Sequence, residues 1–445
     1  MKLRKLENEM PAVTLDFYNS KQLDPRITFT RASFAPATDP GSGTGIAGGQ
    51  YNMFNVNVPR LTDQGLLIEE PRTNRWTNSQ VFSSGWTPND MGTPTDNAAI
   101  APDGTNTAAS VFETATTNTH YIISNQVVPN SFAALSWSIF VKANGRDYVI
   151  FHLLQRFNVV GFYTACIDLK TGEITKELDS SAGGANHWYN FTRKVTPYGN
   201  GWYRIEVGYQ GQNVNGTEAY IYGATGPDPT FGGAASAIPT DTYPGDPTKG
   251  YYLWGFQVED DTFATSYIPT NGSEVTRAAD VCVFNDSNVL GASSGTYVVD
   301  ATLFADPGFN MNNQYVFITQ AATDASSVSI TAGVGYSVQI LDSGSFNGRV
   351  DYKAWTTGVK GIAAVAYAPG PSGSGGADVV YASDGEIRGT NVITTGGSTT
   401  PTNMYQMFLF RAANGAANTL STGYLHRLAF YPTRLSDPAL EALTL

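Results

Sequence analysis

The sequence predicts an all-β protein made of two antiparallel β-sandwich domains that follow an irregular N-terminal leader. Only 14% of the 445 residues are charged, whereas the chain holds 46 glycines and 12% aromatic residues, a composition typical of β-rich proteins with many turns. Runs that alternate apolar and polar residues follow one another along most of the chain, with turn signals such as "KTGE" and "YGNG" between them. No long amphipathic helical pattern interrupts these runs.

Charge and hydropathy argue against two classes of partner. The formal net charge is −12, so the phosphate backbone of a nucleic acid would be repelled. The opening "MKLRKLENEM" lacks the apolar core of a signal peptide, and no stretch has the roughly eighteen apolar residues of a membrane helix. We expect a chain that binds no nucleic acid, does not insert into a membrane and folds in a cytoplasm.

The first expected segment is the leader, residues 1–70. It is polar, contains the glycine-rich "DPGSGTGIAGGQ", and has few apolar residues with which to build a core of its own. Within it, "ITFTRASF" (27–34) predicts a short strand that carries Arg31. A buried arginine needs a carboxylate or carbonyl groups as partners.

The second expected segment, residues 71–281, is a series of strands. "LSWSIFVKA" places Trp137, Ile139 and Val141 on one face, and "GWYRIEVGYQ" places apolar residues from 203 to 209 on one face. "YYLWGFQVE" (251–259) predicts a strand with Tyr252, Trp254, Phe256 and Val258 on one side. Strands of this length joined by turns are typical of a two-sheet sandwich.

The third expected segment, residues 282–445, repeats this pattern. Strand signals begin at "SGTYVVDATLFAD" and end at "GYLHRLAFYPTRL". In the following "SDPALEAL", Asp437 and Pro438 fit the N-cap and the first position of a short closing helix.

Four motifs in order resemble a set found in bacteriophage virion proteins of the tail-fibre, head-spike or adsorption type. They are "ITFTRASF", "LLIEEPRTN", "YGNGWYRIEV" and "YLWGFQVEDDTFATSYIPT" with "VTRAADV". The resemblance covers roughly residues 12–281 and implies a carbohydrate-binding-module-like jelly roll there. The end of the chain, "GYLHRLAFYPTRLSDPALEAL", resembles a concanavalin A-like or laminin-G-like sandwich.

Three arginines within these motifs, Arg31, Arg72 and Arg277, are expected to be structural. Arg31 and Arg277 stand in twin Thr-Arg-Ala tripeptides, which suggests that they tie the leader and the exit strand to one domain body. The expected carboxylate partners are Glu69, Glu70 or Asp280.

The sequence gives no support for catalysis. A glycoside hydrolase needs paired carboxylates roughly 5 to 9 Å apart, and the nearest acidic groups, "VEDDT" (258–262) and "SDGEIRG" (383–389), resemble loop or strand-end residues. No nucleophile elbow occurs, and the four histidines lack zinc-ligand spacing, with His426 fitting a packed core residue. The two cysteines, Cys166 and Cys282, leave open whether a bridge forms. We expect no enzyme and no cofactor, although "EDDT" or "DPTFGG" with "DTYPGDP" could supply oxygen ligands to a structural calcium ion.

Sugar recognition demands less, because a flat aromatic ring stacks on a pyranose while nearby polar groups bind its hydroxyls. In "GGANHWYNF" this pattern brings together Asn186, Trp188 and Tyr189, and "RVDYKAWTTG" offers Trp355 near a turn. Packing inside a core is the alternative for each aromatic residue.

The hypothesis that combines these observations is a structural protein on the exterior of a phage particle that binds host-surface polysaccharide without cleaving it. Its partners would be other virion proteins and the glycan, and the abundant aromatic strand faces suggest self-association, for instance as a trimer. Two alternatives stay open: a capsid decoration or cement protein, and a capsule depolymerase.

Overall fold

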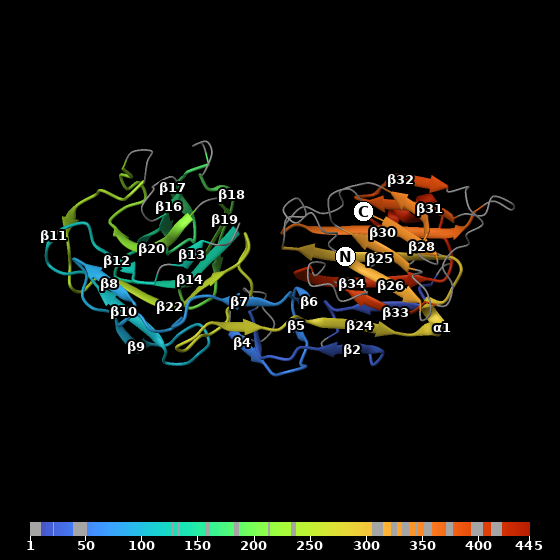
Figure 1. Cartoon of the computed structure of the whole chain (residues 1–445), viewed down its shortest axis with the longest axis horizontal. Coiled ribbons are helices and arrows are strands. Elements are labelled where there is room, and N and C mark those ends of the chain that lie inside the picture. The colour runs from blue at the N-terminus through green and yellow to red at the C-terminus, as the bar shows by residue number, and fades with distance from the viewer. Residues whose placement is uncertain are drawn as a thin grey trace. The chain divides into compact units, whose positions relative to one another are not determined.

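The structure is a computed structural model. It describes residues 10–20, 22–38, 51–126, 128–130, 134–155, 161–181, 187–211, 214–232, 237–304, 315–321, 327–331, 338–342, 345–350, 358–370, 377–392, 404–410 and 421–445. Within these ranges the chain is almost entirely antiparallel β-sheet, which confirms the predicted fold class (Figure 1).

The chain divides into two compact units, and each unit is assembled from separate stretches of sequence. Unit 1 comprises Met1–Phe34, Phe54–Pro71 and Ala278–Leu445, and unit 2 comprises Ala35–Met53 and Arg72–Arg277. The chain therefore passes from one unit to the other four times.

This division corrects the expected irregular leader over residues 1–70. Its described residues form strands, and the buried Val13, Leu15, Leu66 and Ile68 belong to the core of unit 1. Few apolar residues are enough here because these short strands complete a core that the rest of unit 1 supplies.

Unit 1 is a sandwich of two sheets. One sheet has the order β32-β31-β30-β25-β34-β6-β5, with β1 also pairing with β34. Its strands are β1 (Val13–Asp16), β5 (Arg60–Thr62), β6 (Gly65–Ile68), β25 (Gly295–Leu303), β30 (Lys360–Pro369), β31 (Ala377–Ser383), β32 (Glu386–Val392) and β34 (Gly423–Tyr431).

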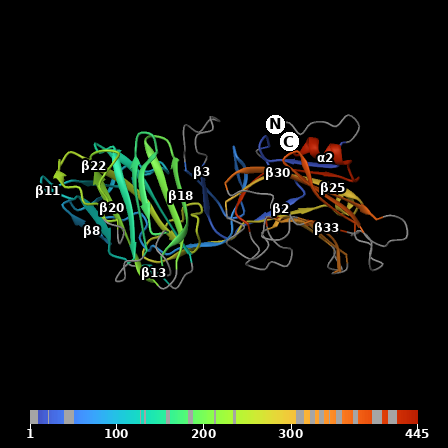
Figure 2. The ribbon, with the colours of Figure 1, turned by 90° about the horizontal axis from the view of Figure 1, so that it is seen from above.

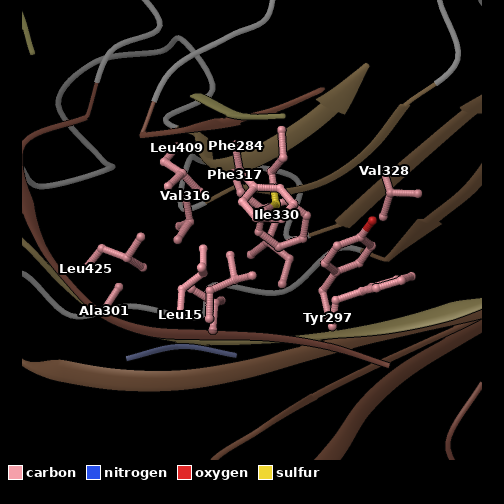
Figure 3. Close-up of a cluster of buried hydrophobic side chains, with 14 of the residues drawn as sticks. Leu15, Phe284, Tyr297, Ala301, Val316, Phe317, Val328, Ile330, Leu409 and Leu425 are labelled. Atoms are coloured by element: carbon pink, nitrogen blue, oxygen red, sulfur yellow. The ribbon is translucent and has the colours of Figure 1, made fainter. Parts of the chain in front are cut away.

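The other sheet of unit 1 has the order β2-β24-β33-β26-β27-β28-β29. Its strands are β2 (Ile27–Thr30), β24 (Val281–Asn285), β26 (Tyr315–Ala321), β27 (Ser327–Thr331), β28 (Val338–Asp342), β29 (Ser345–Val350) and β33 (Met404–Leu409). Side chains from both sheets, among them Leu15, Tyr297, Phe317 and Leu409, meet in one buried core (Figure 3).

Two short helices accompany the sheets of unit 1: α1 (Ser287–Leu290) and α2 (Asp437–Leu443). Helix α2, drawn in red beside β30 in Figure 2, packs Leu440 and Leu443 on the outer face of the first sheet. It confirms the predicted closing helix, but its N-cap is Ser436, so Asp437 is the first helical residue.

Unit 2 is also a two-sheet sandwich. One sheet has the order β18-β19-β14-β22-β10-β9, and the other has the order β17-β16-β15-β20-β12-β8, with β13 also pairing with β20. The first contains β9 (Thr95–Ala99), β10 (Ala108–Phe112), β14 (Ala134–Asn144), β18 (Tyr189–Pro197), β19 (Trp202–Gln210) and β22 (Gly250–Glu259). The second contains β8 (Trp86–Asn89), β12 (Tyr121–Ser124), β13 (Val128–Asn130), β15 (Tyr148–Gln155), β16 (Phe162–Asp168), β17 (Ile174–Asp179) and β20 (Val214–Ala224).

Three short ladders complete the strands of the described chain. They are β3 (Ala35–Thr38) with β4 (Tyr51–Phe54), β7 (Arg72–Asn74) with β23 (Val275–Arg277), and β11 (Thr117–Asn118) with β21 (Tyr243–Pro244).

The predicted inward faces of β14 and β19 are confirmed, because Trp137, Ile139, Val141, Ile205 and Val207 all lie in the core between the sheets of unit 2. The predicted face of β22 holds for Phe256 and Val258, which lie in the same core, but is wrong for Tyr252 and Trp254.

The pairing of β22 with β14 shifts register between Ser138 and Phe140, and Gly255 has a φ of 64°. This irregularity reverses the alternation along β22. Phe256 therefore points into the core between the sheets, while Trp254 packs in a separate aromatic cluster with Phe140 and Tyr267.

Candidate functional site

The aromatic site predicted around Trp188 is not assembled. Trp188 is buried in the core of unit 2, where its ring stacks on Tyr209 with 3.8 Å between centroids. A side chain with no exposed surface cannot stack on a sugar, so this prediction is corrected. Tyr189 is 40% exposed at the start of the edge strand β18. Asn186 and Trp355 lie outside the described residues.

A different aromatic surface lies on the outer face of the β15–β20–β12 sheet of unit 2. We define the tyrosine face as Tyr121, Tyr148, Tyr220 and Tyr222. In the strand register Tyr121 lies opposite Tyr222, and His152 lies opposite Tyr220.

Alternation along the strands explains this placement. The residues between these positions, among them Val149, Phe151, Ala219 and Ile221, point the other way into the core of unit 2. The tyrosines of β20 therefore have to point outward, away from that core.

Three rings of the tyrosine face, those of Tyr121, Tyr220 and Tyr222, lie close together. The ring centroids of Tyr121 and Tyr222 are 4.6 Å apart, and those of Tyr220 and Tyr222 are 5.9 Å apart. Tyr222 is buried beneath its neighbours, whereas Tyr121, Tyr148 and Tyr220 are half-buried. Half-buried rings are the part of the face that a ligand can contact.

A hollow of about 100 Å³ adjoins the tyrosine face. Its lining residues are Thr119, Ile150, Tyr222, Gly223, Ala224, Thr225, Gly226, Asp228, Pro229, Pro239, Asp241 and Tyr243. Thus the hollow combines one ring of the tyrosine face with two aspartates and two threonines, a mixture of apolar and polar groups typical of small-ligand sites.

The segment after β20, which forms one wall of the hollow, is held by polar contacts to the sheet and within itself. The Thr164 hydroxyl donates to the carbonyl of Ala237 at 3.0 Å, and the Asp241 carboxylate accepts from the backbone N–H of Thr230 at 2.7 Å. Asp228 forms an ion pair of 2.6 Å with Lys176. These contacts give the hollow a defined wall.

His152 lies buried beside the tyrosine face as a neutral imidazole. Its Nδ1 is 2.7 Å from the Thr164 hydroxyl. Because that hydroxyl donates its hydrogen to Ala237, Nδ1 carries the imidazole proton. Burial lowers the pKa of His152 to about 3. A histidine that stays neutral near pH 7 supports packing rather than proton transfer.

The acidic groups singled out in the sequence have structural partners. In the loop after β22, Asp260 pairs with Arg75 and Asp261 pairs with Arg72. Burial raises the pKa of Glu259, which accepts hydrogen bonds from Gln257 and Thr265.

The second group of acids lies in unit 1, where Asp384 and Glu386 both pair with Arg388. In neither group do two carboxylates stand together without a basic partner.

Metal and thiol chemistry find little support in the part of the chain that the structure describes. No group of three histidine, cysteine, aspartate or glutamate side chains there could hold a metal ion. Cys166 and Cys282 are free and buried, and burial raises the pKa of both thiols. His426 is buried, as predicted, with its Nε2 2.7 Å from the Thr302 hydroxyl. None of the helices in the described ranges is long and apolar enough to cross a membrane.

The predicted arginines separate between the two units. Arg31 in unit 1 forms a buried ion pair of 3.0 Å with Asp280 and donates to the carbonyls of Ser33 and Asn55, as the sequence led us to expect. Arg72 pairs with Asp261 in unit 2. Arg277 is also buried in unit 2, opposite Arg72 in the β7–β23 ladder. That Arg31 and Arg277 tie the leader and the exit strand to one domain body stays a prediction.

The sequence reasoning missed Arg60, which completes the ion cluster of unit 1. Arg60 is fully buried and pairs with both Glu69 and Asp280. We call Arg31, Arg60, Glu69 and Asp280 the unit 1 ion cluster. The signal was the β5–β6 hairpin, which brings residues 60 and 69 together on either side of its turn.

Comparisons with known proteins add little. No protein-family model matches the chain, and no curated protein matches it. Among solved structures, the CBM40 of a Ruminococcus gnavus IT-sialidase bound to alpha2,3 sialyllactose is similar, with 17% identity and a TM-score of 0.28 over 36% of this chain and 85% of that one.

Two further solved structures are similar to parts of the chain. A heptameric SAP-like pentraxin from Limulus polyphemus has 10% identity and a TM-score of 0.25 over 35% of this chain and 71% of that one. Domains LG4-5 of the mouse laminin alpha1 chain have 10% identity and a TM-score of 0.20 over 80% of this chain and 90% of that one. At these scores the similarities carry no argument about the ligand or activity of this chain.

Proposed function

We propose that this protein binds a glycan on the tyrosine face of unit 2 and does not cleave it. The observation that carries the proposal is the set of closely spaced rings of Tyr121, Tyr220 and Tyr222, two of them half-buried, beside a hollow lined by Asp228 and Asp241. Tyrosine rings stack on the apolar side of a pyranose, while carboxylates accept hydrogen bonds from its hydroxyl groups. That the protein does not cleave the glycan is part of the proposal. In its support, the acidic groups that come nearest to a catalytic carboxylate pair in the sequence form ion pairs with arginines.

The biological setting belongs to the same proposal. The four ordered motifs that resemble phage adsorption proteins support a structural role on the exterior of a virion, in contact with other virion proteins and with host-surface polysaccharide. Self-association and many copies per particle would convert weak single contacts into firm adhesion through a high effective concentration. Labelling of purified phage particles with an antibody raised against this chain tests the setting, and particles that carry no label would contradict it.

The glycan proposal is tested by affinity electrophoresis through gels that contain bacterial surface polysaccharides. Stacking on one ring contributes roughly 1 kcal/mol, so Tyr121→Ala and Tyr220→Ala should each weaken retention by about 5-fold. The matched control is Tyr189→Ala, which removes an exposed tyrosine from the other sheet of unit 2 and should leave retention unchanged.

Two results would contradict the glycan proposal. Retention that is lost in the Tyr189 variant but kept in both others would place the site elsewhere. Release of new reducing ends from the polysaccharide during incubation would show that the protein is a depolymerase instead.

A further inference from the structure

We propose that the tyrosine face selects uncharged sugars and repels anionic ones such as uronic or sialic acids. This inference rests on the proposed glycan binding and names the chemical class of the ligand. The charges around the hollow are its basis. Among the described residues that line the hollow there is no lysine or arginine, whereas Asp228 and Asp241 both contribute carboxylates.

Further carboxylates surround the same surface. Glu218 lies on the outer side of β20, two residues before Tyr220, and accepts a hydrogen bond of 3.1 Å from the Tyr220 hydroxyl. Asp168 lies opposite Tyr148 in the pairing of β15 with β16. The tyrosine face therefore has acidic groups beside both β15 and β20.

The basic groups nearby are already neutralised within the fold. Lys176 pairs with Asp228 at 2.6 Å. Arg146 lies over the ring of Tyr243, 4.8 Å from its centroid, but donates to both oxygens of the buried Glu113 at 2.6 and 2.8 Å. Each of these cations is thus balanced by a carboxylate of the fold, and the two ion pairs add no net positive charge beside the hollow.

The consequence for ligand choice follows from simple electrostatics. A neutral sugar brings hydroxyl donors, which the carboxylates of the hollow accept, because each carboxylate has more acceptor positions than its present partner fills. An anionic sugar brings a second negative charge close to these carboxylates. At a separation of roughly 7 Å and an effective dielectric constant near 60, the repulsion between the ligand carboxylate and one carboxylate of the hollow weakens binding by about 4-fold. Salt screens this repulsion.

The experiment uses one uronic acid polysaccharide in two forms, native and carboxyl-reduced, so that the backbone stays the same while the charge is removed. Binding of each form to the full chain is measured by affinity electrophoresis in low salt and in about 0.5 M salt. We expect the reduced form to bind at least about 4-fold more tightly in low salt, and the ratio to approach one in high salt.

Two variants locate the effect. The double variant Asp228→Asn with Asp241→Asn should bring the ratio of the affinities for the reduced and the native form closer to one, because these side chains line the hollow. Asp384→Asn in unit 1 removes one carboxylate charge from an exposed side chain outside unit 2 and should leave the affinity ratio of the two forms unchanged. Urea midpoints equal to that of the parent chain confirm that the variants are folded.

Each outcome has a distinct meaning. Equal or tighter binding of the native anionic form in low salt overturns the selection of neutral sugars, while the glycan proposal stands. If neither form is retained by the parent chain, and no neutral polysaccharide is retained either, the glycan proposal itself fails.

Discussion

Replacement of Asp280 by asparagine tests the unit 1 ion cluster. The Asp280 carboxylate pairs with Arg31 at 3.0 Å and with Arg60, and it accepts the backbone N–H of Glu69 at 2.8 Å. Two buried guanidinium groups face two buried carboxylates, so the cluster is neutral. Burial by itself would lower the pKa of Arg60, but Asp280 and Glu69 outweigh it and raise that pKa. A guanidinium group keeps its proton at neutral pH, so both arginines stay charged after the substitution, and one positive charge is left without compensation.

The expected cost follows from that uncompensated charge. Removal of one partner from a buried ion pair costs about 3 to 5 kcal/mol, and asparagine keeps the shape and one acceptor, so we expect about 3 kcal/mol. With an m-value of about 3 kcal/mol/M, the urea midpoint of unit 1 should fall by about 1 M. The matched control is Glu386→Ala, which removes an exposed partner of Arg388 in the same unit and should cost less than about 1 kcal/mol.

The two units can be followed separately. Six of the seven tryptophans lie in unit 2, so their fluorescence reports mainly on that unit. Hydrogen exchange in peptides from β25 and β34 reports on unit 1. In Asp280→Asn we expect the urea midpoint measured by hydrogen exchange in unit 1 to fall, and the midpoint measured by tryptophan fluorescence in unit 2 to stay unchanged. A cost below about 1 kcal/mol for unit 1 would refute the idea that this cluster is a charge-balanced core element.

The remaining predictions concern unit 2. Gly255→Ala should destabilise it by about 2 kcal/mol or more in urea unfolding, because its φ is 64° and a Cβ would lie 2.9 Å from the Phe140 ring; Gly226→Ala, which meets nothing within 4 Å, is the neutral control. His152 has a pKa of about 3 in the fold, so below about pH 6.5 the unfolded state binds an extra proton. The free energy of unfolding of unit 2 should therefore fall by about 1 kcal/mol as the pH falls from about 6 to 5. We expect His152→Gln to remove this loss, and an equal pH slope in both proteins would contradict the prediction. Calcium or EDTA should leave the fluorescence midpoint unchanged, because the aspartates of loop 258–262 already pair with arginines; a calcium-dependent rise would reveal a structural ion.

Much of the fold could be predicted because strand alternation is a local property. The inward faces of β14 and β19 follow directly from a period of two, and the closing helix follows from Asp437 and Pro438 at its start, although its N-cap is Ser436. Burial of Arg31 with a carboxylate partner also follows from sequence, since a charged side chain in an apolar strand requires one.

The candidate site could not be predicted from the sequence, because the burial of a strand face depends on whether a second sheet packs against it. Trp188 and the tyrosines of β20 stand in similar local patterns, yet the first lies between two sheets and the others face outward. The pairing that sets Tyr121 opposite Tyr222 joins residues about a hundred positions apart, which no local pattern encodes.

By itself the sequence determined the all-β character, the inward faces of regular strands and the need for partners around buried charges, because each depends on neighbours along the chain. The tertiary structure alone decided that early residues complete the core of unit 1, that Gly255 reverses the faces of β22, and that four tyrosines lie on the outer face of one sheet. These features arise from contacts between distant strands, whose free energy depends on the packing of the whole unit.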